Sequence, residues 1–327
     1  MINLRKLFAV ALLLLGWHAQ AAVYTLPAAH DTLIGQVLYV TTRDEDTLFA
    51  LGRQYGVGYE EMVAANPGVD PWVPGAGRRI LIPTQYLLPD APRVGIVVNV
   101  SEHRIYYYPK AKPGEASVVY TFPVSIGKMD WKTPLGQTFI ADKRMNPTWY
   151  PPASVRKEHA ARGDYLPAAI PPGKDNPLGE FAMRLGIRGG SYLIHGTNKP
   201  IAVGMDVTHG CIRMFPEDIE NFFKQVPIGT PVLIMDQPYK MGWSEGHLYM
   251  EVHKPLELGE AQWDRDPTDL TRMFVGATRQ HPARMDWQDA EQVFRSNLGV
   301  PSAVKLLQPA LMTDMRREGE HPDARSE

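Results

Sequence analysis

The stretch HGTNKPIAVGMDVTHGCIRM, residues 195–214, holds the single cysteine of a 327-residue chain. Cys211 directly follows His209 and Gly210, and His195 ends the strand-like run SYLIH earlier in the chain. A cysteine without a second cysteine in its chain is a buried small hydrophobe, an intermolecular partner or a reactive thiol. The residues around Cys211 decide among these roles.

Those residues favour a nucleophile. A cysteine reacts when an imidazole or backbone N–H groups favour its thiolate. A sheet could carry His195 against Cys211 as a base, and the Gly196 carbonyl could orient its second ring nitrogen. The peptide between Gly210 and Cys211 could present N–H groups to a developing oxyanion. An inert buried thiol remains the alternative at this point.

A metal site is the weaker interpretation of the same residues. His195, His209 and Cys211 could in principle bind zinc, but a histidine and a cysteine two positions apart on a tight loop are an unusual ligand pair. No second cysteine or carboxylate cluster completes four ligands. We therefore expect no metal and no organic cofactor.

The N-terminus predicts export. Arg5 and Lys6 precede an apolar run at residues 7–17, and Ala19-Gln20-Ala21 has the small-x-small form that signal peptidase cleaves. The run is about half the length that a membrane span needs. We predict a signal peptide over residues 1–21, with an uncleaved anchor as the alternative.

Composition limits the remaining possibilities. A hydrophobic fraction of 44% with 21% charged residues is typical of a globular protein with a substantial core. The net charge of −2 argues against nucleic acid as a partner. Prolines and glycines are scattered along the chain, which favours a β-rich, loop-rich fold.

Residues 37–83 have the pattern of a small separate unit. A short strand precedes Asp46, which we predict as a helix N-cap, and Gly56 closes that helix. A second helix in YEEMVAANPG and a strand in RRILIP complete a βααβ order. With DTLFALGRQYGV, AANPGVD and GRRILIP in sequence, the unit resembles the LysM module, a resemblance that implies binding to N-acetylglucosamine polymers such as peptidoglycan. An unrelated small α+β unit is the alternative.

Residues 94–235 predict a second, β-rich domain. Residues 84–93 look like a linker, and VGIVVNV and RIYYYP then flank SEH as a hairpin. Further β-rich runs are SVVYTFPVSIG, GQTFIADKRM, SYLIHG and TPVLIM. One helix is expected at residues 216–226, because Pro216 begins it and apolar residues recur at helical spacing.

The remaining residues carry weaker signals. Residues 236–311 predict an appended region, with a strand in GHLYMEVHKPLEL and a helix capped by Asp286 and stopped near Gly299. The charged tail, residues 312–327, has the composition of a disordered segment.

The stretch IHGTNKPIAVGMDVTHGCIRM closely resembles the active-site signature of the L,D-transpeptidases of the YkuD type. TPLGQTFI and GTPVLIM resemble two further segments of that family, so the resemblance extends over residues 94–235. It implies a mainly β catalytic domain, a mixed and sandwich-like fold with one helix after the nucleophile.

The resemblance also implies roles for individual residues. Cys211 would be the acylated nucleophile, His195 its base and Gly196 the carbonyl that orients the base. His209 and Gly210 would shape the oxyanion pocket. The resemblance places two further residues at the substrate, Arg213 to bind a carboxylate and Thr208 in the position where serine is commoner.

The reaction implied is attack on the bond between diaminopimelate and D-Ala of a peptidoglycan tetrapeptide stem, followed by transfer to an amine. The LysM-like unit, the HGCIR variant and QPYKMGWSEGHLYMEVH resemble the ErfK/YbiS branch, which implies a periplasmic enzyme that joins an outer-membrane lipoprotein to peptidoglycan. The alternatives are 3-3 crosslinking of stems, hydrolysis by a cysteine peptidase, and a non-catalytic wall-binding protein.

Overall fold

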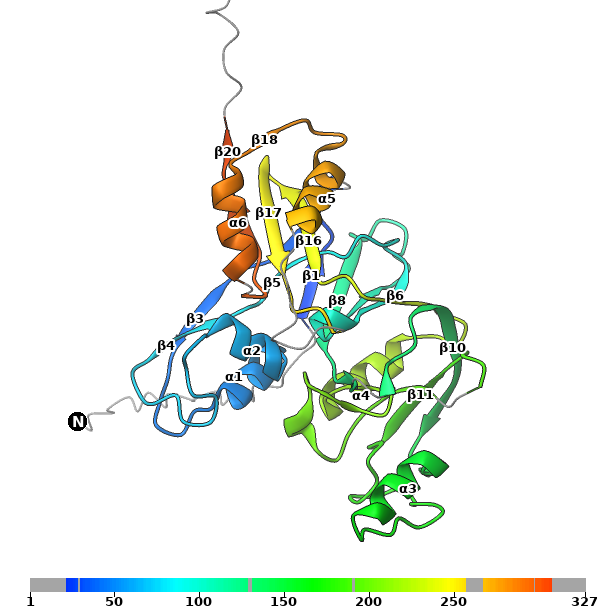
Figure 1. The fold of residues 1–327 in the computed structure, drawn as a ribbon. Coiled ribbons are helices and arrows are strands. Elements are labelled where there is room, and N and C mark those ends of the chain that lie inside the picture. Colours follow the sequence, from blue (N-terminus) through cyan, green and yellow to red (C-terminus); the bar gives the residue numbers. More distant parts are fainter. Residues whose placement is uncertain are drawn as a thin grey trace, which may run out of the picture.

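A nine-stranded sheet forms the centre of the computed structural model, which describes residues 22–28, 30–128, 131–189, 192–256, 267–296 and 298–307 (Figure 1). The predicted signal peptide and charged tail lie outside these residues. The strand order is β1 (Ala22–Thr25), β8 (Val118–Pro123), β7 (Arg104–Tyr108), β6 (Gly95–Asn99), β15 (Pro231–Met235), β10 (Gly136–Met145), β11 (Phe181–Leu185), β12 (Leu193–His195) and β14 (Ile212–Arg213).

The sheet has two halves that share β10. The strand register shifts between Ile140 and Asp142, where β10 passes from its pairing with β15 to its pairing with β11. The pairs β15–β6 and β12–β14 are parallel and the other pairs are antiparallel, so the sheet is mixed. Two short strands, β9 (Ile126–Gly127) and β13 (Asp206–Thr208), form a separate parallel pair beside it.

One apolar core joins both halves to α4 (Pro216–Gln225), the helix predicted after Cys211. Ile219, Phe222 and Val226 of the predicted stripe are buried in this core. Side chains alternate along β11, β12 and β14, so Met183, Ile194 and Ile212 face the core. The residues between them face the opposite side of the sheet, where Cys211 lies.

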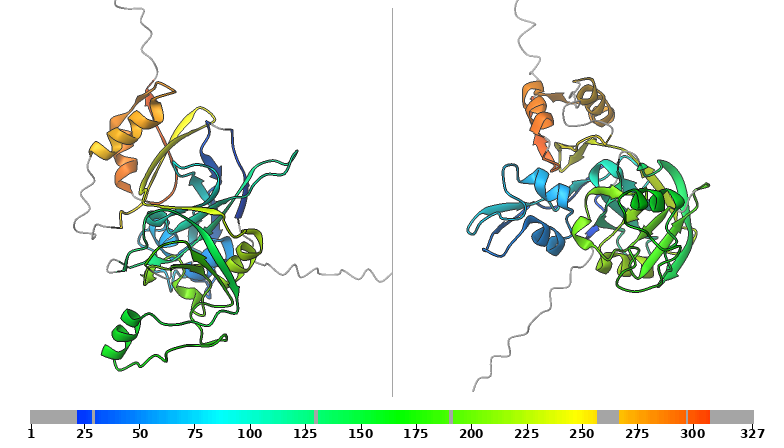
Figure 2. Two further views of the ribbon diagram at one scale, coloured as in Figure 1. Left: turned by 90° about the vertical axis from the view of Figure 1, so that its right-hand side faces the viewer. Right: turned by 60° about the horizontal axis from the view of Figure 1, so that its bottom comes forward.

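The predicted hairpin is confirmed, since β6 and β7 pair across η1 (Val100–Glu102). Between β10 and β11 the chain forms α3 (Ala153–Ala161), a helix the sequence did not predict. Figures 1 and 2 show α3 projecting from the end of the domain that contains the central sheet, away from both other units. A second turn of 3-10 helix, η3 (Pro200–Ala202), precedes β13.

The predicted βααβ order of residues 37–83 is observed in β3 (Leu38–Thr41), α1 (Leu48–Tyr55), α2 (Tyr59–Ala65) and β4 (Arg79–Ile82), with its own core. Gly56 ends α1 with a φ of 69°. The predicted N-cap was wrong by one residue. Thr47 caps α1 by accepting a hydrogen bond from the Ala50 amide at 3.0 Å, because the Asp46 carboxylate instead accepts one from the Arg43 amide.

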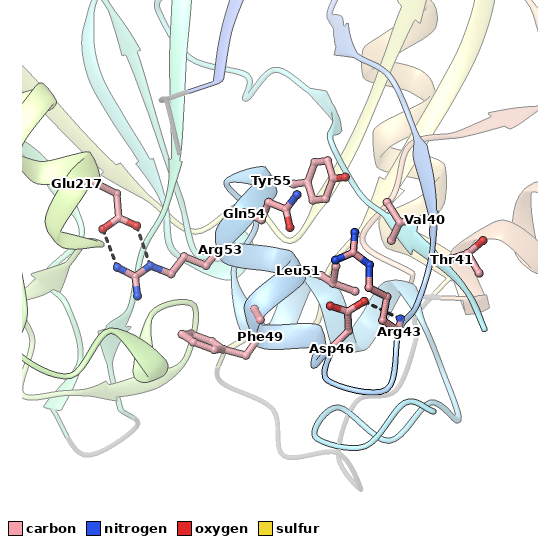
Figure 3. A pocket seen from close by; sticks show the side chains of 11 residues that line it. Val40, Thr41, Arg43, Asp46, Phe49, Leu51, Arg53, Gln54, Tyr55 and Glu217 are labelled. Carbon is pink, nitrogen blue, oxygen red and sulfur yellow. Dashed lines mark hydrogen bonds and ion pairs between the residues drawn. The ribbon is translucent and has the colours of Figure 1, made fainter. Parts of the chain in front are cut away.

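Two arginine–glutamate pairs attach this unit to the domain that contains the central sheet. Glu61 of α2 binds the Arg104 guanidinium of β7 at distances of 2.6–2.9 Å, and both side chains are buried. Arg53 of α1 binds Glu217 of α4 through two hydrogen bonds at the edge of an open groove beside α1 (Figure 3).

We expect Glu61→Gln to destabilise the chain by about 3–5 kcal/mol, because it leaves a buried guanidinium without its counter-charge. Glu217→Gln is the matched control, since it makes the same chemical change at a partly exposed pair and should cost about 1 kcal/mol or less. Urea unfolding measures both free energies. Equal losses would show that burial does not decide the cost.

The predicted linker at residues 84–93 is wrong. Gln85–Leu87 is a strand, β5, that pairs with β2 (Leu33–Gly35). Tyr86 and Leu88 are buried in an apolar cluster with residues of the central sheet, and Leu87 is buried where its amide donates a hydrogen bond to Glu251 of the C-terminal region. The apolar residues within the predicted linker are therefore packed in the interior of the protein, and the segment is not a flexible linker.

The C-terminal region packs α5 (Pro267–Thr278) and α6 (Trp287–Ser296) on a three-stranded sheet of β16 (Tyr239–Ser244), β17 (His247–Val252) and β19 (Ser302–Val304). The pair β18 (Arg284–Met285) and β20 (Leu306–Leu307) lies beside it. As predicted, Asp286 caps α6, accepting a hydrogen bond from the Asp289 amide.

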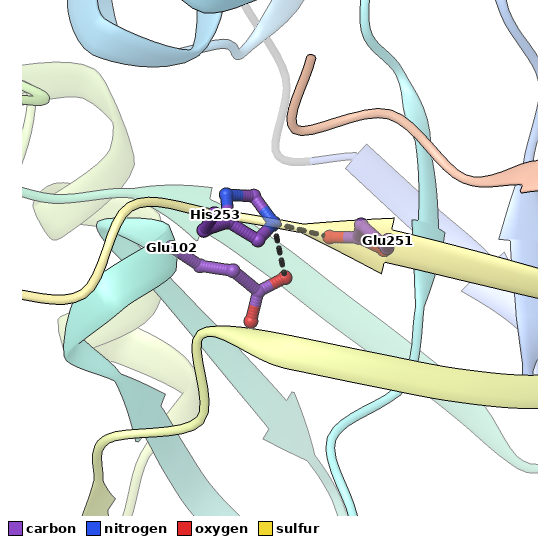
Figure 4. A group of neighbouring side chains, drawn as sticks. All are labelled: Glu102, Glu251 and His253. Atoms are coloured by element: carbon purple, nitrogen blue, oxygen red, sulfur yellow. Dashed lines mark hydrogen bonds and ion pairs between the residues drawn. The ribbon is translucent and has the colours of Figure 1, made fainter. Parts of the chain in front are cut away.

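A buried charged cluster fixes this region to the domain that contains the central sheet. Glu102, Glu251 and His253 offer ligand atoms within 4.8 Å of one another (Figure 4). The Lys240 ammonium binds both carboxylates, 2.8 Å from Glu251, and also the Leu87 carbonyl. The cluster is therefore an ion-pair junction whose cation is the lysine.

Candidate active site

Two parallel strands bring Cys211 and His195 together. Ile194 of β12 pairs with Ile212 of β14, and His195 pairs with Arg213. Cys211 directly precedes β14 and therefore lies beside Leu193. Cys211 is half-buried, and it lines the same cavity of about 520 Å³ as His195. A larger groove of about 1150 Å³ lies beside α1, but no cysteine or histidine lines it.

The His195 ring is held in one orientation. Its Nδ1 atom lies 2.6 Å from the Gly196 carbonyl oxygen, and the side chain is 4% exposed. Nδ1 therefore donates a proton to that carbonyl, which leaves Nε2 as the proton acceptor. A Cβ at position 196 would lie 3.1 Å from Ile219, so a larger residue would crowd α4.

Two features fix the turn before Cys211, a glycine conformation and a hydrogen bond. Gly210 has a φ of 95°, and a Cβ there would meet the Tyr192 ring at 2.9 Å, so only glycine fits. The Thr208 hydroxyl donates to the Cys211 carbonyl at 2.6 Å and is buried. These two features fix the conformation of the loop that precedes Cys211.

His209 points to residues that the sequence analysis did not identify. Its Nε2 atom lies 2.5 Å from the Glu158 carboxylate of α3, and the Trp131 ring packs edge-on at 5.2 Å. The His209 hydrogen bond, followed by that of Lys128, lowers the pKa of Glu158 to about 2. No sequence signal could reveal this contact, because α3 lies in a separate segment between β10 and β11.

The environment keeps the Cys211–His195 pair uncharged. Burial raises the pKa of the Cys211 thiol, although a backbone hydrogen bond from Leu193 and the charge of Arg213 act in the opposite direction. Burial and the Arg213 charge lower the pKa of His195 to about 3. Both shifts favour a neutral thiol beside a neutral imidazole.

We expect iodoacetamide to alkylate Cys211 about tenfold faster for each pH unit between pH 6 and 9, because only the thiolate reacts and the thiol pKa lies above its ordinary value of 9.0. Intact mass spectrometry at each pH measures the rate, with glutathione as the reference thiol. A rate that is already constant from pH 6 upward would instead show a stable thiolate–imidazolium pair.

Arg213 brings a cation into the cavity. Its Nε atom is buried and has no hydrogen-bond partner among the residues that the structure describes. A buried donor without a partner is costly, so a group that accepts a hydrogen bond from Nε would be stabilised there. Burial lowers the pKa of the guanidinium, but an arginine stays charged at neutral pH. The site can thus bind an anionic group next to the dyad.

Comparison with known proteins places this site in a family. The model of the YkuD L,D-transpeptidase catalytic domain matches residues 93–234. The probable L,D-transpeptidase YcfS of Escherichia coli K12 is 42% identical over 88% of this chain and 89% of its own length. Probable L,D-transpeptidase YbiS of the same strain is 37% identical over 92% of this chain and 98% of its own length.

The chain belongs to the L,D-transpeptidase family. The prediction of an enzyme of this class is confirmed, as is the mainly β catalytic fold.

None of the helices in the described part of the chain is both long and apolar enough to span a membrane.

Proposed function

We propose that this enzyme cleaves the diaminopimelate–D-Ala bond of peptidoglycan tetrapeptide stems through an acyl-cysteine at Cys211. One observation carries the proposal: Cys211 and His195 share a cavity, and the Gly196 carbonyl holds Nδ1 so that Nε2 can accept the thiol proton. The experiment that tests it measures D-Ala release from a purified tetrapeptide muropeptide, together with the mass of the acid-quenched enzyme.

The reaction needs an acyl donor, an acceptor amine and one group that carries protons between them. As Cys211 Sγ bonds to the stem carbonyl, its proton passes to His195 Nε2. The imidazolium then protonates the leaving nitrogen, and D-Ala departs as the C–N bond breaks. An acceptor amine next attacks the thioester, His195 takes up the amine proton, and the thiol leaves with that proton. Starting from a neutral pair, each half-reaction moves one proton through His195, and the second half-reaction restores the free thiol and the neutral imidazole.

The loop before Cys211 would stabilise the oxyanion. The fixed turn at Gly210 holds the Cys211 amide beside the thiol, and such preorganised N–H donors lower acyl-transfer barriers. His209 would shape this pocket from its anchor on Glu158. Thr208, whose hydroxyl is bound to the Cys211 carbonyl, would hold the loop and not contact the substrate.

Arg213 would bind the terminal carboxylate of the stem. It pairs with His195 in the sheet register, so a carboxylate bound to it would lie on the same side of the cavity as His195. A charge-assisted hydrogen bond to the D-Ala carboxylate would satisfy its unpartnered Nε donor.

For the acceptor, we propose the C-terminal lysine of an outer-membrane lipoprotein, in the periplasm after removal of the signal peptide. The support is the similarity to the ErfK, YbiS and YcfS proteins over most of the chain. Mass spectrometry of sacculi from cells with this enzyme alone tests it. Tripeptides carrying lysine or Lys-Arg remnants would support attachment. Dimers with 3-3 links and no remnants would favour crosslinking, and unmodified tripeptides alone would indicate hydrolysis.

Residues 37–83 would act as a LysM-like module that binds glycan. In this unit Trp72 is 44% exposed and stacks on Tyr59 with ring centroids 5.6 Å apart, which leaves an aromatic face for a sugar ring. Removing the whole unit would leave the buried Arg104 guanidinium without its partner Glu61, so a point substitution is the cleaner test.

We expect Trp72→Ala to weaken sacculus pull-down several-fold, about 1–2 kcal/mol, since exposed aromatic residues often contribute that much to binding. D-Ala release from soluble muropeptides should be unchanged. Trp287→Ala on the C-terminal region is the control, because that ring is similarly exposed at 48%. Equal pull-down for both variants would argue against glycan binding at this face.

A further inference from the structure

The cavity floor consists of two rows of side chains that cross four strands. Register pairs Asp142 with Arg184, Arg184 with Leu193, Arg144 with Ala182, and Ala182 with His195. The parallel pairing of β12 and β14 extends the rows to Cys211 and Arg213. The first row is Asp142, Arg184, Leu193 and Cys211, and the second is Arg144, Ala182, His195 and Arg213. All eight residues line the cavity.

The first row places a cation at a fixed spacing from the thiol. Neighbouring strands lie about 4.8 Å apart, so the backbone of Arg184 is about 10 Å from that of Cys211. Leu193 occupies the strand between them and is only partly buried. Along this line the cavity floor therefore presents, in order, a nucleophile, an apolar surface and a cation.

The far end of the row also carries an anion. The Arg184 side chain is exposed to the cavity and makes no hydrogen bond or salt bridge within the described part of the chain, although its charge acts on the neighbouring Asp142. Asp142, beside it, accepts hydrogen bonds from Arg144 Nε and from the Lys143 amide, each at 2.9 Å. Both contacts favour the ionised carboxylate, which has about four acceptor positions and so keeps capacity for another donor.

We propose that Arg184 and Asp142 form a subsite for the free amino-acid end of diaminopimelate in the acyl donor, which rests on the proposed function. Arg184 binds the carboxylate of the D-centre, and Asp142 binds its ammonium group. The methylene chain between the D-centre and the reacting carbonyl crosses Leu193.

The dimensions agree with this assignment. Five carbon–carbon bonds separate the reacting carbonyl carbon from the D-centre, about 6–7 Å with bond lengths near 1.5 Å. The D-centre carboxylate and the guanidinium side chain span the rest of the distance to β11. Arg213 does not compete for this group, because it lies in the second row next to His195.

A second carboxylate of the stem, on the D-Glu residue, has the same charge and must be distinguished by experiment. We would measure kcat/KM for D-Ala release by the full mature chain with five donors. These are the diaminopimelate tetrapeptide, its forms with the D-centre carboxylate amidated, the D-centre amine acetylated or the D-Glu carboxylate amidated, and a tetrapeptide with lysine in place of diaminopimelate.

Arg184→Gln should lower kcat/KM for the diaminopimelate donor about 10- to 100-fold, mainly through KM, because it removes a charge-assisted hydrogen bond. Amidation of the D-centre carboxylate should cost the wild type a similar factor and cost Arg184→Gln almost nothing more. The lysine donor, which lacks this carboxylate, should behave in the same way. Acetylating the amine should affect the wild type and leave Asp142→Asn almost unchanged.

Arg188→Gln is the matched control, since it removes one exposed arginine charge outside the cavity and should leave kcat/KM unchanged. Equal melting temperatures and equal iodoacetamide rates would exclude a folding or thiol defect. The subsite is overturned if kcat/KM of Arg184→Gln for the diaminopimelate donor stays within twofold of the wild-type value. It is also overturned if Arg184→Gln and amidation of the D-centre carboxylate lower kcat/KM by independent factors that multiply when the two are combined. A third contradicting result would be that amidation of the D-Glu carboxylate lowers kcat/KM of the wild type but not of Arg184→Gln. No D-Ala release by wild type from any donor would overturn the proposed function itself.

Discussion

Replacing Cys211 with alanine should abolish D-Ala release from tetrapeptide stems, with a loss of at least about 10⁴-fold in kcat. The thiol supplies the bond-forming atom, and no other cysteine is among the described residues that line the cavity. D-Ala released by the acid-quenched variant and by wild type can be quantified after derivatisation.

The variant should keep its fold, because Cys211 is half-buried and outside the apolar core. An unchanged melting temperature and unchanged sacculus binding are the controls for this claim. Thr208→Val serves as a second control, since it disturbs the same loop without removing the thiol. If Cys211→Ala and Thr208→Val lost activity equally, the thiol would not be the source of the chemistry.

His195→Ala should lose D-Ala release nearly as fully, by about 10³-fold or more, because members of one catalytic unit are strongly non-additive. His209→Ala should retain slow turnover, since its Nε2 is engaged with Glu158 and not free to accept the thiol proton. Single-turnover acylation with both variants measures the difference. A larger loss for His209→Ala would exchange the roles of the two histidines.

The sequence predicted most of the local structure around the thiol. The strand ending in His195, the turn at Gly210 and the helix from Pro216 each depend on nearby residues, and the structure has all three. The same holds for Gly56 and Asp286, which end and begin their helices through contacts within a few residues. Local signals of this kind can be recognised without knowledge of the fold.

Long-range contacts could not be predicted in this way. Arg184 faces Leu193 only because β11 pairs with β12 in one register, and Glu158 reaches His209 only because α3 folds back toward the cavity. The error at residues 84–93 has the same origin, since Tyr86 and Leu87 are buried by units that lie far away in the chain. A neutral dyad is likewise a property of burial, which the sequence alone does not give.

Peptide mapping of acid-quenched enzyme tests the acyl-cysteine most directly. Wild-type enzyme is mixed with a tetrapeptide muropeptide without an acceptor, quenched at successive times, digested and examined by mass spectrometry. We predict an adduct equal to the donor minus D-Ala, located on Cys211 and appearing in step with the first equivalent of D-Ala. An adduct on any other residue, or a first equivalent of D-Ala released while the Cys211 peptide stays unmodified at every time, would contradict the account.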